Sequence, residues 1–419
     1  MNQDFDVAVI GGGPAGSTAG TLLARNGRSV VILEKEKFPR FRVGESMLPA
    51  SSDTLERMGV KEKVDHGGFL IKYGGEICSA CGAARARFYF RNGLNAKRHT
   101  SYQVERAKFD QILLDHARET GCDVREQTPV DKFDFDADGV TIRCNNGSVV
   151  VRAKYLLDCS GRNSLIANRF DLKQAYPNLK KFSVFAHYDH VDRLHGQDGT
   201  LTRMIRCADG WFWMIPMAEG RASVGVVMDI AKFRAMNLTP EEALKQCIAE
   251  QPEVREWMHN ARPCTPIYAT SDFSYRVKRL TGERWVLAGD AAGFLDPVFS
   301  SGVYIAIYSG EKAADTLNAV LARPEKRSRA FRLYERAVHQ RFDAYFRLTS
   351  AWYTKEFVEI FLHPRELCQL VPTVNAVLSG NPARSFGVKW RMCLFYLLVY
   401  LQGRSGKLVP QLTFQPKAS

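Results

Sequence analysis

The sequence lacks a hydrophobic run long enough to cross a membrane. Met392–Leu401 is a run of ten consecutive apolar residues, well short of the roughly 20 that a transmembrane helix needs. An apolar strand pattern begins already at Phe5, which leaves no room for an N-terminal signal peptide. We therefore expect a cytoplasmic protein without a transmembrane segment.

The cysteine pattern favours neither a disulfide framework nor a metal site. The ten cysteines are scattered, and only Cys78 and Cys81 form a C-x-x-C pair. That pair has no second pair and no histidine at the spacing of a zinc site. A chain of 419 residues, 45% of them apolar, can build a core without disulfides. We expect reduced thiols and no metal.

Acidic residues are too few to balance the basic ones. The formal net charge is +13, from 58 Lys and Arg against 45 Asp and Glu. Such a balance favours acidic partners, but the basic residues are dispersed and no nucleic-acid-binding module is present. We expect no nucleic acid partner and favour an acidic protein or anionic ligands. A solvated basic surface with no partner is the open alternative.

A glycine-rich turn near the N-terminus is the first strong motif. An apolar strand ends at Ile10, then Gly11, Gly13 and Gly16 form G-x-G-x-x-G, and a helical pattern covers Ala15–Asn26. In such a turn the first glycine permits the tight bend, the second admits a pyrophosphate to the backbone, and the third lets helix pack on strand. The helix N-terminus offers N–H groups and a positive dipole end to the pyrophosphate.

A carboxylate follows the next strand. The strand Ser29–Leu33 ends at Glu34, 23 residues after the first glycine, where a carboxylate can hold a ribose 2′-hydroxyl. Together these features predict a site for an ADP-containing dinucleotide. The segment Lys35–Pro49 is too long for a hairpin, and we expect it to lie over the cofactor. Arg40 and Arg42 are then available to phosphate or flavin oxygens, and a plain surface crossover is the alternative.

The remaining pattern predicts more strands and a helical C-terminal part. Tyr155–Arg162 is an apolar strand that ends in a glycine turn, which could return beside the first turn, and Arg284–Ala292 is a third strand that ends in a glycine turn. Phe69–Ile77 is predicted as one strand with a lysine inside it, and the alternation over Phe182–Met228 predicts a largely antiparallel sheet. Helices are predicted over Ser52–Arg57, Ala107–Thr120, Ala231–Trp257 and Val303–Ala322, and from Ser328 onward with interruptions at Pro364, Pro372 and Pro382.

The glycine turn, followed far along the chain by the Gly289-Asp290 turn, resembles the FAD-dependent monooxygenases of the aromatic hydroxylase type over about the first 320 residues. In that superfamily the Asp of the second turn holds the ribityl chain and an Arg before a helix contacts the flavin; Asp290 and Arg106 match. No second G-x-G-x-x-G serves NAD(P)H, so a separate flavin reductase is expected to supply FADH2. The residues expected to bind FAD are Gly11, Gly13, Pro14, Ala15, Gly16, Glu34, Lys35, Arg42, Ser46, Arg106, Asp290, Gly302 and Val303.

The resemblance implies an α/β (α+β) fold: a Rossmann-like FAD-binding domain with an inserted antiparallel-sheet substrate domain and a helical C-terminal region. The expected FAD-binding domain takes residues 1–75, 100–170 and 275–322, the substrate-side domain 76–99 and 171–274, and the helical region 323–419. The apolar run in that last region is expected to form a helix that covers the active-site side of the core. An interfacial membrane anchor is the alternative.

Within that superfamily, three motifs resemble those of the flavin-dependent halogenases, and they occur in the family's order. They are G-F-x-x-K at Gly68, Phe69 and Lys72; W-x-W-x-I-P at Trp211, Trp213, Ile215 and Pro216; and F-x-x-P-x-x-S-x-G at Phe294, Pro297, Ser300 and Gly302. In such enzymes reduced flavin reacts with oxygen to a C4a-hydroperoxide, and chloride or bromide attacks its terminal oxygen. The backbone N–H groups of the turn at Ser300, Ser301 and Gly302 are expected to hold the halide.

The resemblance also implies a role for the lysine and a wall around the reaction. Lys72 is expected to deliver hypohalous acid to the substrate, by hydrogen bonding or as a haloamine. Burial among Phe69, Ile71 and Tyr73 would lower its pKa; a surface lysine on an amphipathic strand is the alternative. The expected wall of the tunnel between flavin and substrate is formed by Trp211, Trp213, Ile215, Pro216, Phe294 and Pro297, with plain core aromatics as the alternative.

One position departs from the tryptophan-halogenating enzymes. They carry a Glu just before the S-x-G turn, where this chain has Phe299. The chain therefore resembles the subgroup that acts on phenols or pyrroles, free or bound to an acyl or peptidyl carrier protein, in secondary-metabolite biosynthesis. The net charge of +13 suits an acidic carrier. An aromatic hydroxylase, a geranylgeranyl-reductase-like enzyme for an apolar substrate, and a flavin-binding protein without turnover are the alternatives.

Overall fold

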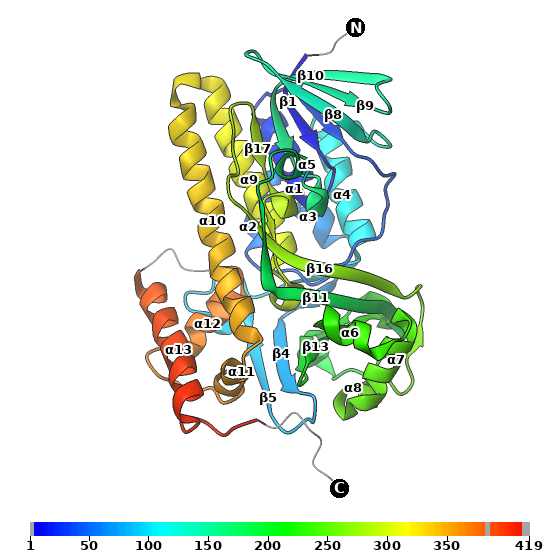
Figure 1. The fold of residues 1–419 in the computed structure, drawn as a ribbon, viewed down its shortest axis with the longest axis vertical. Helices are drawn as coiled ribbons and strands as arrows, with labels where there is room; N and C mark the ends of the chain where they lie inside the picture. The colour runs from blue at the N-terminus through cyan, green and yellow to red at the C-terminus, as the bar shows by residue number, and fades with distance from the viewer. Residues whose placement is uncertain (1–3, 382–385, 413–419) are drawn as a thin grey trace.

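The computed structural model describes residues 4–381 and 386–412. Two sheets follow one another along the long axis of the molecule, and the chain begins in the upper one (Figure 1). The upper sheet has seven strands in the order β7 (Asp123–Arg125), β2 (Val30–Leu33), β1 (Asp4–Ile10), β10 (Val149–Asp158), β9 (Val140–Cys144) and β8 (Val130–Phe135), with β17 (Trp285–Leu287) also paired to β10.

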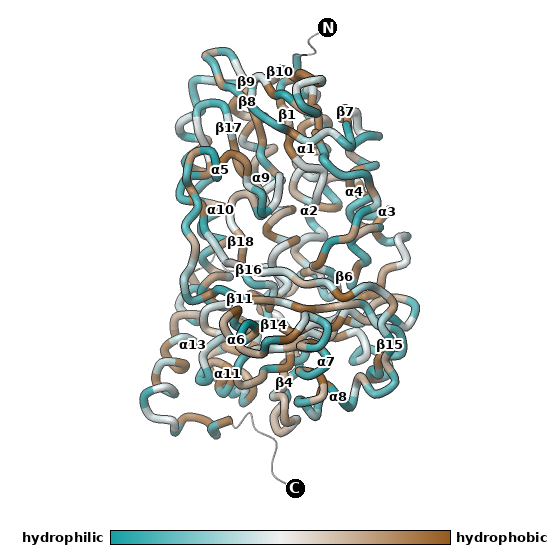
Figure 2. Tube along the Cα trace, turned by 45° about the vertical axis from the view of Figure 1, so that its right-hand side comes forward, coloured by the Kyte–Doolittle hydropathy of each residue, from teal (hydrophilic) through white to brown (hydrophobic). Residues whose placement is uncertain are grey.

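The centre of the upper sheet is parallel, with β7, β2, β1, β10 and β17 running the same way, while β9 and β8 add an antiparallel extension. Strand β1 carries a hydrophobic run in the middle of this half of the molecule (Figure 2). Burial on both faces explains that run. The helix α1 (Pro14–Arg25) packs against α4 (Arg106–Glu119) and α9 (Ser301–Ala322).

The carboxyl ends of β1, β10 and β17 meet at one edge of the sheet. The N–H of Cys159 donates to the carbonyl of Ile10 at 2.9 Å, and the N–H of Ala288 donates to the carbonyl of Asp158 at 3.0 Å. The expected return of the second glycine turn beside the first is therefore confirmed, and the third turn lies next to the second. A crevice at this edge is where open α/β sheets bind ligands.

The lower sheet has nine strands and is antiparallel except for the pair β12–β4. The order is β18 (Gly293–Phe294), β16 (Tyr268–Val277), β11 (Lys173–Asp189), β14 (Ala222–Asp229), β13 (Gly210–Pro216), β12 (Thr202–Arg206), β4 (Gly74–Ser79) and β5 (Arg85–Tyr89), with β15 (Arg262–Pro263) on β11. The largely antiparallel sheet predicted over Phe182–Met228 is thus confirmed.

Helices cover both faces of the lower sheet, because its side chains alternate between two apolar clusters. Phe212 and Met214 point toward α6 (Ile230–Met236), α7 (Pro240–Glu250) and α8 (Pro252–Trp257). Trp211, Trp213 and Ile215 point to the other face, where the C-terminal helices lie. These helices are α10 (Arg327–Trp352), α11 (Lys355–Leu362), α12 (Leu370–Leu378) and α13 (Phe386–Ser405).

The single strand predicted over Phe69–Ile77 is wrong. The chain forms β3 (Leu70–Lys72), which pairs only with β6 (Ser101–Gln103), and then enters β4 of the lower sheet. The switch follows from Gly74, where a Cβ would lie 1.9 Å from the carbonyl oxygen of Phe88. Only glycine allows β4 to approach β5 so closely.

The predicted helices form, and two details of the C-terminal part differ. Pro372 does not interrupt a helix; it lies in the first turn of α12, where its missing N–H costs no helical hydrogen bond. Pro364 separates α11 from α12 as expected, and Pro382 lies outside the described residues. The predicted apolar helix is α13, but it is outermost: α11 and α12 lie between it and the lower sheet (Figure 1).

The other short elements are α2 (Ser51–Met58), α3 (Lys61–Asp65), α5 (Leu165–Arg169), and the 3-10 turns η1 (Phe90–Asn92), η2 (Gly161–Asn163), η3 (Gly196–Thr200), η4 (Ala218–Gly220), η5 (Gly289–Ala291), η6 (Pro297–Phe299) and η7 (Pro324–Lys326). The boundaries of the three predicted domains stay a prediction.

Candidate active site

The glycine turn between β1 and α1 has no space for side chains at two positions. Gly11 has φ of +98°, and a Cβ there would lie 2.5 Å from the carbonyl oxygen of Cys159. At Gly16 a Cβ would lie 1.9 Å from the carbonyl oxygen of Gly11, so the helix packs directly on the turn. At Gly13 the nearest atom to a Cβ is Nη2 of Arg40 at 3.3 Å. Gly13 is therefore half-exposed beneath the Arg40 guanidinium, where a phosphate could approach, whereas Pro14 and Ala15 behind it are buried.

Glu34 lies at this turn, as the motif predicts. Its carboxylate is buried and accepts hydrogen bonds from the backbone N–H of Gly12 at 2.7 Å and of Glu36 at 2.9 Å. The acid is thus fixed next to the nucleotide turn, in the place where a ribose would lie.

Arg42 is the arginine of the following loop that we expected to bind FAD. The structure instead brings Arg40 of the same loop to the glycine turn. Arg40 reaches Gly13 and pairs with the buried Asp110, Nη1 to Oδ2 at 2.9 Å. Burial lowers the pKa of Arg40. Arg42 instead pairs with Glu36 at 2.6 Å on the exposed side, and Lys35 points outward near the same carboxylate. The signal for Arg40 was present in the sequence, but the pattern could not rank the two.

The loop Lys35–Pro49 is tied down across the site. Arg106, in the first turn of α4, donates to both carboxylate oxygens of Asp110 at 2.9 Å and to the carbonyl of Val43 at 2.7 Å. A Cβ at Gly44 would lie 3.6 Å from Cγ2 of Val303 in α9. The loop therefore runs between the starts of α4 and α9 and is not a plain surface crossover.

The carboxylate of Asp290 comes to the same edge of the upper sheet. It lies in η5, directly after β17, and its backbone carbonyl accepts a hydrogen bond from the Tyr275 hydroxyl at 2.6 Å. The glycine turn, Glu34, Arg106 and Asp290 thus come from separate parts of the sequence to one edge of the upper sheet.

Lys72 is fully buried, which excludes the surface alternative. Its Nζ donates to Oγ of Ser46 at 2.7 Å and to the carbonyl of Met47 at 3.2 Å, and lies 5.2 Å from the ring centroid of Phe90. Because no carboxylate of residues 4–381 or 386–412 pairs with it to offset its burial, the pKa of Lys72 is lowered to about 7.

The expected surroundings of this lysine are wrong. Ile71 is 39% exposed, because neighbouring residues of a strand point to opposite sides. The same alternation turns Tyr73 away from Lys72, and it lines a small surface hollow with Tyr89. Ser46 and Phe90, from a loop and from η1, provide the pocket instead.

A hydrogen-bonded chain connects Lys72 to the lower sheet. Oγ of Ser46 lies 2.9 Å from Oγ1 of Thr202, which also accepts from Nε2 of Gln103 at 2.8 Å. Thr202 is on β12, two residues before Met204, which pairs with Trp213. Both therefore lie on the tryptophan face of the sheet. Sequence reasoning missed Thr202 and Gln103, since no local pattern marks them.

The two tryptophans pack side by side in the apolar cluster on that face, and their role as a wall stays a prediction. The ring centroids of Trp211 and Trp213 are 5.8 Å apart, and both side chains are buried together with Ile215. Nε1 of Trp213 donates to Oγ of Ser223 at 3.0 Å. Nε1 of Trp211 donates to the hydroxyl of Tyr353 at 3.1 Å. Both indoles are therefore fixed by packing and by a hydrogen bond.

Tyr353 joins the W-x-W-x-I-P motif to the F-x-x-P-x-x-S-x-G motif. Its hydroxyl donates to Oδ2 of Asp296 at 2.7 Å, between Phe294 of β18 and Pro297 of η6. Tyr353 directly follows α10 in the C-terminal part, and no sequence pattern connects it with Trp211.

The F-x-x-P-x-x-S-x-G motif ends in the turn that begins α9. Ser300 has φ of 56°, and the helix starts at Ser301. Gly302 is exposed, and a Cβ there would meet no atom within 4 Å. Phe299 is buried against the rings of Trp352 and Phe357, at centroid distances of 5.8 and 6.3 Å. The position of the missing Glu is thus filled by the core, while the helix start stays accessible.

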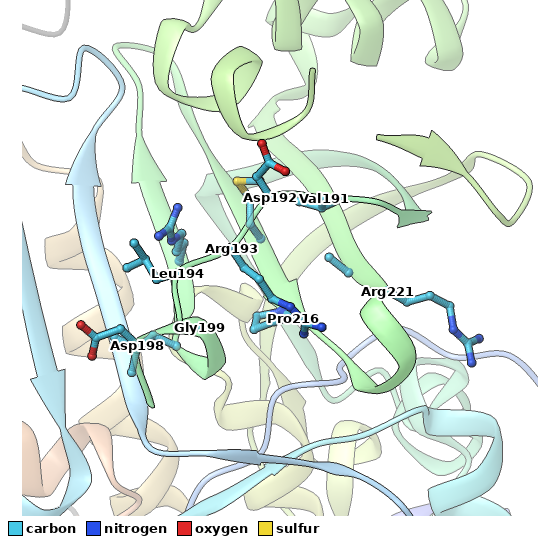
Figure 3. Close-up of a pocket in the computed structure, with 12 residues that line it drawn as sticks. Val191, Asp192, Arg193, Leu194, Asp198, Gly199, Pro216 and Arg221 are labelled. Carbon is cyan, nitrogen blue, oxygen red and sulfur yellow. The ribbon is translucent and has the colours of Figure 1, made fainter. Parts of the chain in front are cut away.

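Figure 3 shows a different hollow, on the other face of the lower sheet. Pro216 and Met214 line it together with Arg193 and Leu194. Only Pro216 among the predicted wall residues reaches it, so this hollow is separate from the tryptophan face.

Other expectations concern metals and membranes. Within residues 4–381 and 386–412, no group of three or more His, Cys, Asp or Glu side chains could hold a metal ion. The same residues contain no helix that is long and apolar enough to span a membrane.

The crevice at the edge of the upper sheet fits FAD. The open backbone at Gly13 suits a pyrophosphate, Glu34 lies where a ribose would be held, and Asp290 lies farther along the same edge. The open start of α9 at Gly302 would face the flavin end.

Comparison with known proteins agrees with this reading. The family model described as "FAD binding domain" matches residues 4–347. The chain is 30% identical over 377 residues to the 1H-pyrrole-2-carbonyl-[peptidyl-carrier protein] chlorinase of Pseudomonas fluorescens, covering 84% of each chain. Two solved structures are each 27% identical. The flavin-dependent brominase Bmp2 has a TM-score of 0.86 and coverage of 96% of this chain and 100% of that chain. A flavoprotein/dehydrogenase from Cytophaga hutchinsonii has a TM-score of 0.87 and coverage of 97% and 100%.

FAD is thus the cofactor of this protein, and the fold expected from the sequence is confirmed. By this family model and this relative, the chain belongs to the family of flavin-dependent halogenases, which are FAD-dependent enzymes of the oxidoreductase type.

Proposed function

We propose that this enzyme uses FADH2, oxygen and chloride or bromide to form hypohalous acid, which Lys72 delivers to an electron-rich aromatic substrate. Reduced FAD, when bound, would supply the electrons that activate oxygen. Lys72 is the residue that carries the proposal, because a buried amine with a pKa of about 7 is neutral in half of the molecules at pH 7. A neutral amine has the lone pair that can accept a hydrogen bond from hypohalous acid or bind the halogen.

The chemistry balances with no further reactant. The neutral amine of Lys72 and hypohalous acid would give a haloamine and water, and transfer of the halogen to an aromatic carbon would return the amine while the ring loses a proton. Ser46 and the carbonyl of Met47 accept two N–H groups of Lys72 and so hold Nζ in one orientation. That fixed geometry favours transfer in one direction.

The halide and the wall are assigned to the two other motifs. The N–H groups at the start of α9, from Ser301 and Gly302 after the left-handed Ser300, would hold the halide against the positive end of the helix. Trp211 and Trp213 would separate the oxidation of halide from the substrate, because their rings are held by Tyr353 and Ser223. Ile215, Phe294 and Pro297 would complete this wall, whereas Pro216 faces the hollow on the opposite side of the sheet and is not part of it.

The substrate and partners follow from the apolar position of Phe299 and from the relatives. We propose a phenol or pyrrole, presented on an acyl or peptidyl carrier protein, since the Pseudomonas relative is a chlorinase of a carrier-bound pyrrole. An electron-rich ring of this kind needs no carboxylate at the position of Phe299. We also propose a separate flavin reductase as the source of FADH2, and a cytoplasmic location.

The test is mass spectrometry of a complete reaction. It would contain the FAD-loaded protein, a flavin reductase with NADH, bromide, and a panel of phenols and pyrroles, both free and bound to carrier protein. The expected product shows the bromine isotope doublet, which the Lys72→Ala variant abolishes while FAD content is unchanged. Lys108→Ala, which removes an exposed lysine of α4, is the matched control and should retain the product.

Other outcomes would contradict the proposal in distinct ways. A product that gains only oxygen would assign the protein to the hydroxylases. Reduction of an apolar substrate without halide dependence would favour the reductase alternative. A Lys72→Ala variant that still halogenates would remove this lysine from the mechanism.

A further inference from the structure

The outer face of helix α13 is apolar, although nothing in residues 4–381 or 386–412 covers it. The exposed fractions are 83% for Phe386, 57% for Tyr400, 49% for Leu397, 41% for Leu401 and 37% for Trp390. The exposed positions 386, 390, 393 (a cysteine), 397 and 400 follow one another at intervals of three or four residues, so they share one side of the helix, and Leu401 lies beside them. Val388 and Phe395 on the other side are buried in the core.

A continuous exposed apolar stripe of this size needs an explanation. Helices that are hydrophobic all round belong inside a protein or against another apolar medium. Large exposed apolar patches on a folded protein mark sites of interaction with proteins or membranes. In Figure 1, α13 forms an outer edge of the molecule, which leaves this stripe accessible to such a partner.

The charged side chains of α13 itself are all basic, although Glu356 and Glu359 of α11 pack against its C-terminal part. From Leu367 to the C-terminus the sequence contains no Asp and no Glu. The basic residues in that part are Arg384, Lys389, Arg391, Arg404, Lys407 and Lys417. Lys389 near the start of α13, and Arg404 and Lys407 near its end, are exposed. The apolar stripe is therefore bordered by positive charge at both ends.

This charge argues against two of the possible occupants. A second copy of the helix would bring basic ends together with no carboxylate on either helix to compensate. A carrier protein that hands its substrate to Lys72 would gain little from this face, because α11 and α12 lie between α13 and the lower sheet (Figure 1).

An anionic lipid surface fits all of these features. Helices that lie in the membrane interface combine aromatic and aliphatic side chains on one face with Lys and Arg at its borders. Trp and Tyr, such as Trp390 and Tyr400 here, prefer the depth of the lipid headgroups. Basic residues at the border gain from lipid phosphates.

We propose that α13 binds the protein to membranes that contain anionic lipids. The helix lies parallel to the surface, with Phe386, Trp390, Leu397, Tyr400 and Leu401 in the boundary between headgroups and acyl chains. Lys389, Arg404 and Lys407 contact lipid phosphates. This surface is separate from the FAD crevice, and its test does not depend on the proposed halogenation.

Sedimentation with lipid vesicles tests the proposal on the full-length, FAD-loaded protein. We expect vesicles of phosphatidylcholine with phosphatidylglycerol to bind it about tenfold or more strongly than phosphatidylcholine alone, with binding that weakens as salt increases. The variant Leu397→Gln/Tyr400→Gln should lose about tenfold or more in affinity. Leu333→Gln is the matched control, because Leu333 is a 57% exposed leucine on α10 and not on this stripe.

Fluorescence adds a second readout that reports the position of the helix. Brominated lipids should quench Trp390, whose signal is the difference between the wild type and Trp390→Phe. Unchanged FAD content and an unchanged urea midpoint would show that the variants are folded.

Several results would overturn the proposal. These are equal binding to neutral and anionic vesicles, no binding to either, or the same affinity for the α13 variant and the wild type. A dimer that forms without lipid and is lost in Leu397→Gln/Tyr400→Gln would assign the stripe to self-association. Loss of binding to a purified acidic carrier protein, with vesicle binding unaffected, would assign it to that partner.

Discussion

The buried amine of Lys72 makes the stability of the fold depend on pH in a defined way. The folded pKa is about 7, against an ordinary value of 10.5. Below pH 7 both states carry the proton, and burial of the charge costs the folded state about 5 kcal/mol, at about 1.4 kcal/mol for each pKa unit. Above pH 10.5 both states are neutral and the cost is gone. Between these limits the unfolded chain binds one more proton, so this contribution to stability rises with pH.

The perturbation is Lys72→Met, which keeps the length of the side chain and removes the charge. The variant loses the hydrogen bonds to Ser46 and Met47, worth about 1 kcal/mol each, at every pH. At pH 8 the removed burial cost is about 3 kcal/mol, so the variant should be the more stable protein there. Its advantage should fall by about 1.4 kcal/mol for each pH unit between about pH 7 and pH 10.

The assay is urea unfolding of both proteins at several pH values over that interval. Lys108→Met, which removes an exposed lysine, serves as the control and should follow the wild type. The slope decides the question, since the lost hydrogen bonds change only the offset. A difference between Lys72→Met and wild type that does not vary with pH would show that the buried lysine keeps its proton, and the reasoning would be refuted.

Two further predictions concern the tryptophan wall and the nucleotide site. Tyr353→Phe removes the acceptor of Trp211 Nε1 and the donor to Asp296, so it should lower the free energy of unfolding by about 1–3 kcal/mol without loss of FAD. Urea unfolding and flavin absorbance measure the two quantities. Unchanged stability would mean that the hydroxyl does not join the two motifs. Arg40→Ala should weaken FAD binding about tenfold, whereas Arg42→Ala should change it less than about twofold. A titration of the apoprotein with FAD measures both affinities. Equal effects would contradict the different orientations of the two side chains.

Local pattern was enough for the elements whose cause is local. The strand, glycine turn and helix around Gly11 and Gly16 were predictable because the spacing of the glycines between an apolar strand and a helix is itself the signal, and Gly16 packs on the nearby carbonyl of Gly11. The face shared by Trp211 and Trp213 was predictable because side chains of a strand alternate. The left-handed Ser300 before α9 was not predicted, but the start of a helix near Gly302 was.

Expectations that depended on neighbours in space were less reliable. Phe69–Ile77 has the pattern of one strand, yet it divides at Tyr73 because the backbone of Gly74 approaches that of Phe88. Phe88 lies outside the segment from which the strand was predicted. The pocket of Lys72 was predicted from its neighbours in sequence, whereas Ser46 and Phe90 form it.

The sequence by itself determined the nucleotide turn and the three family motifs, including Lys72 in the first of them, because residue type and spacing carry that information. Only the tertiary structure decided that Lys72 is buried without a carboxylate and that Arg40, not Arg42, reaches the glycine turn. It also decided that Tyr353 joins two motifs and that α13 presents an apolar face outward. The physical reason is that burial, and with it pKa, orientation and exposure, depends on which segments far apart in the sequence come to lie against one another.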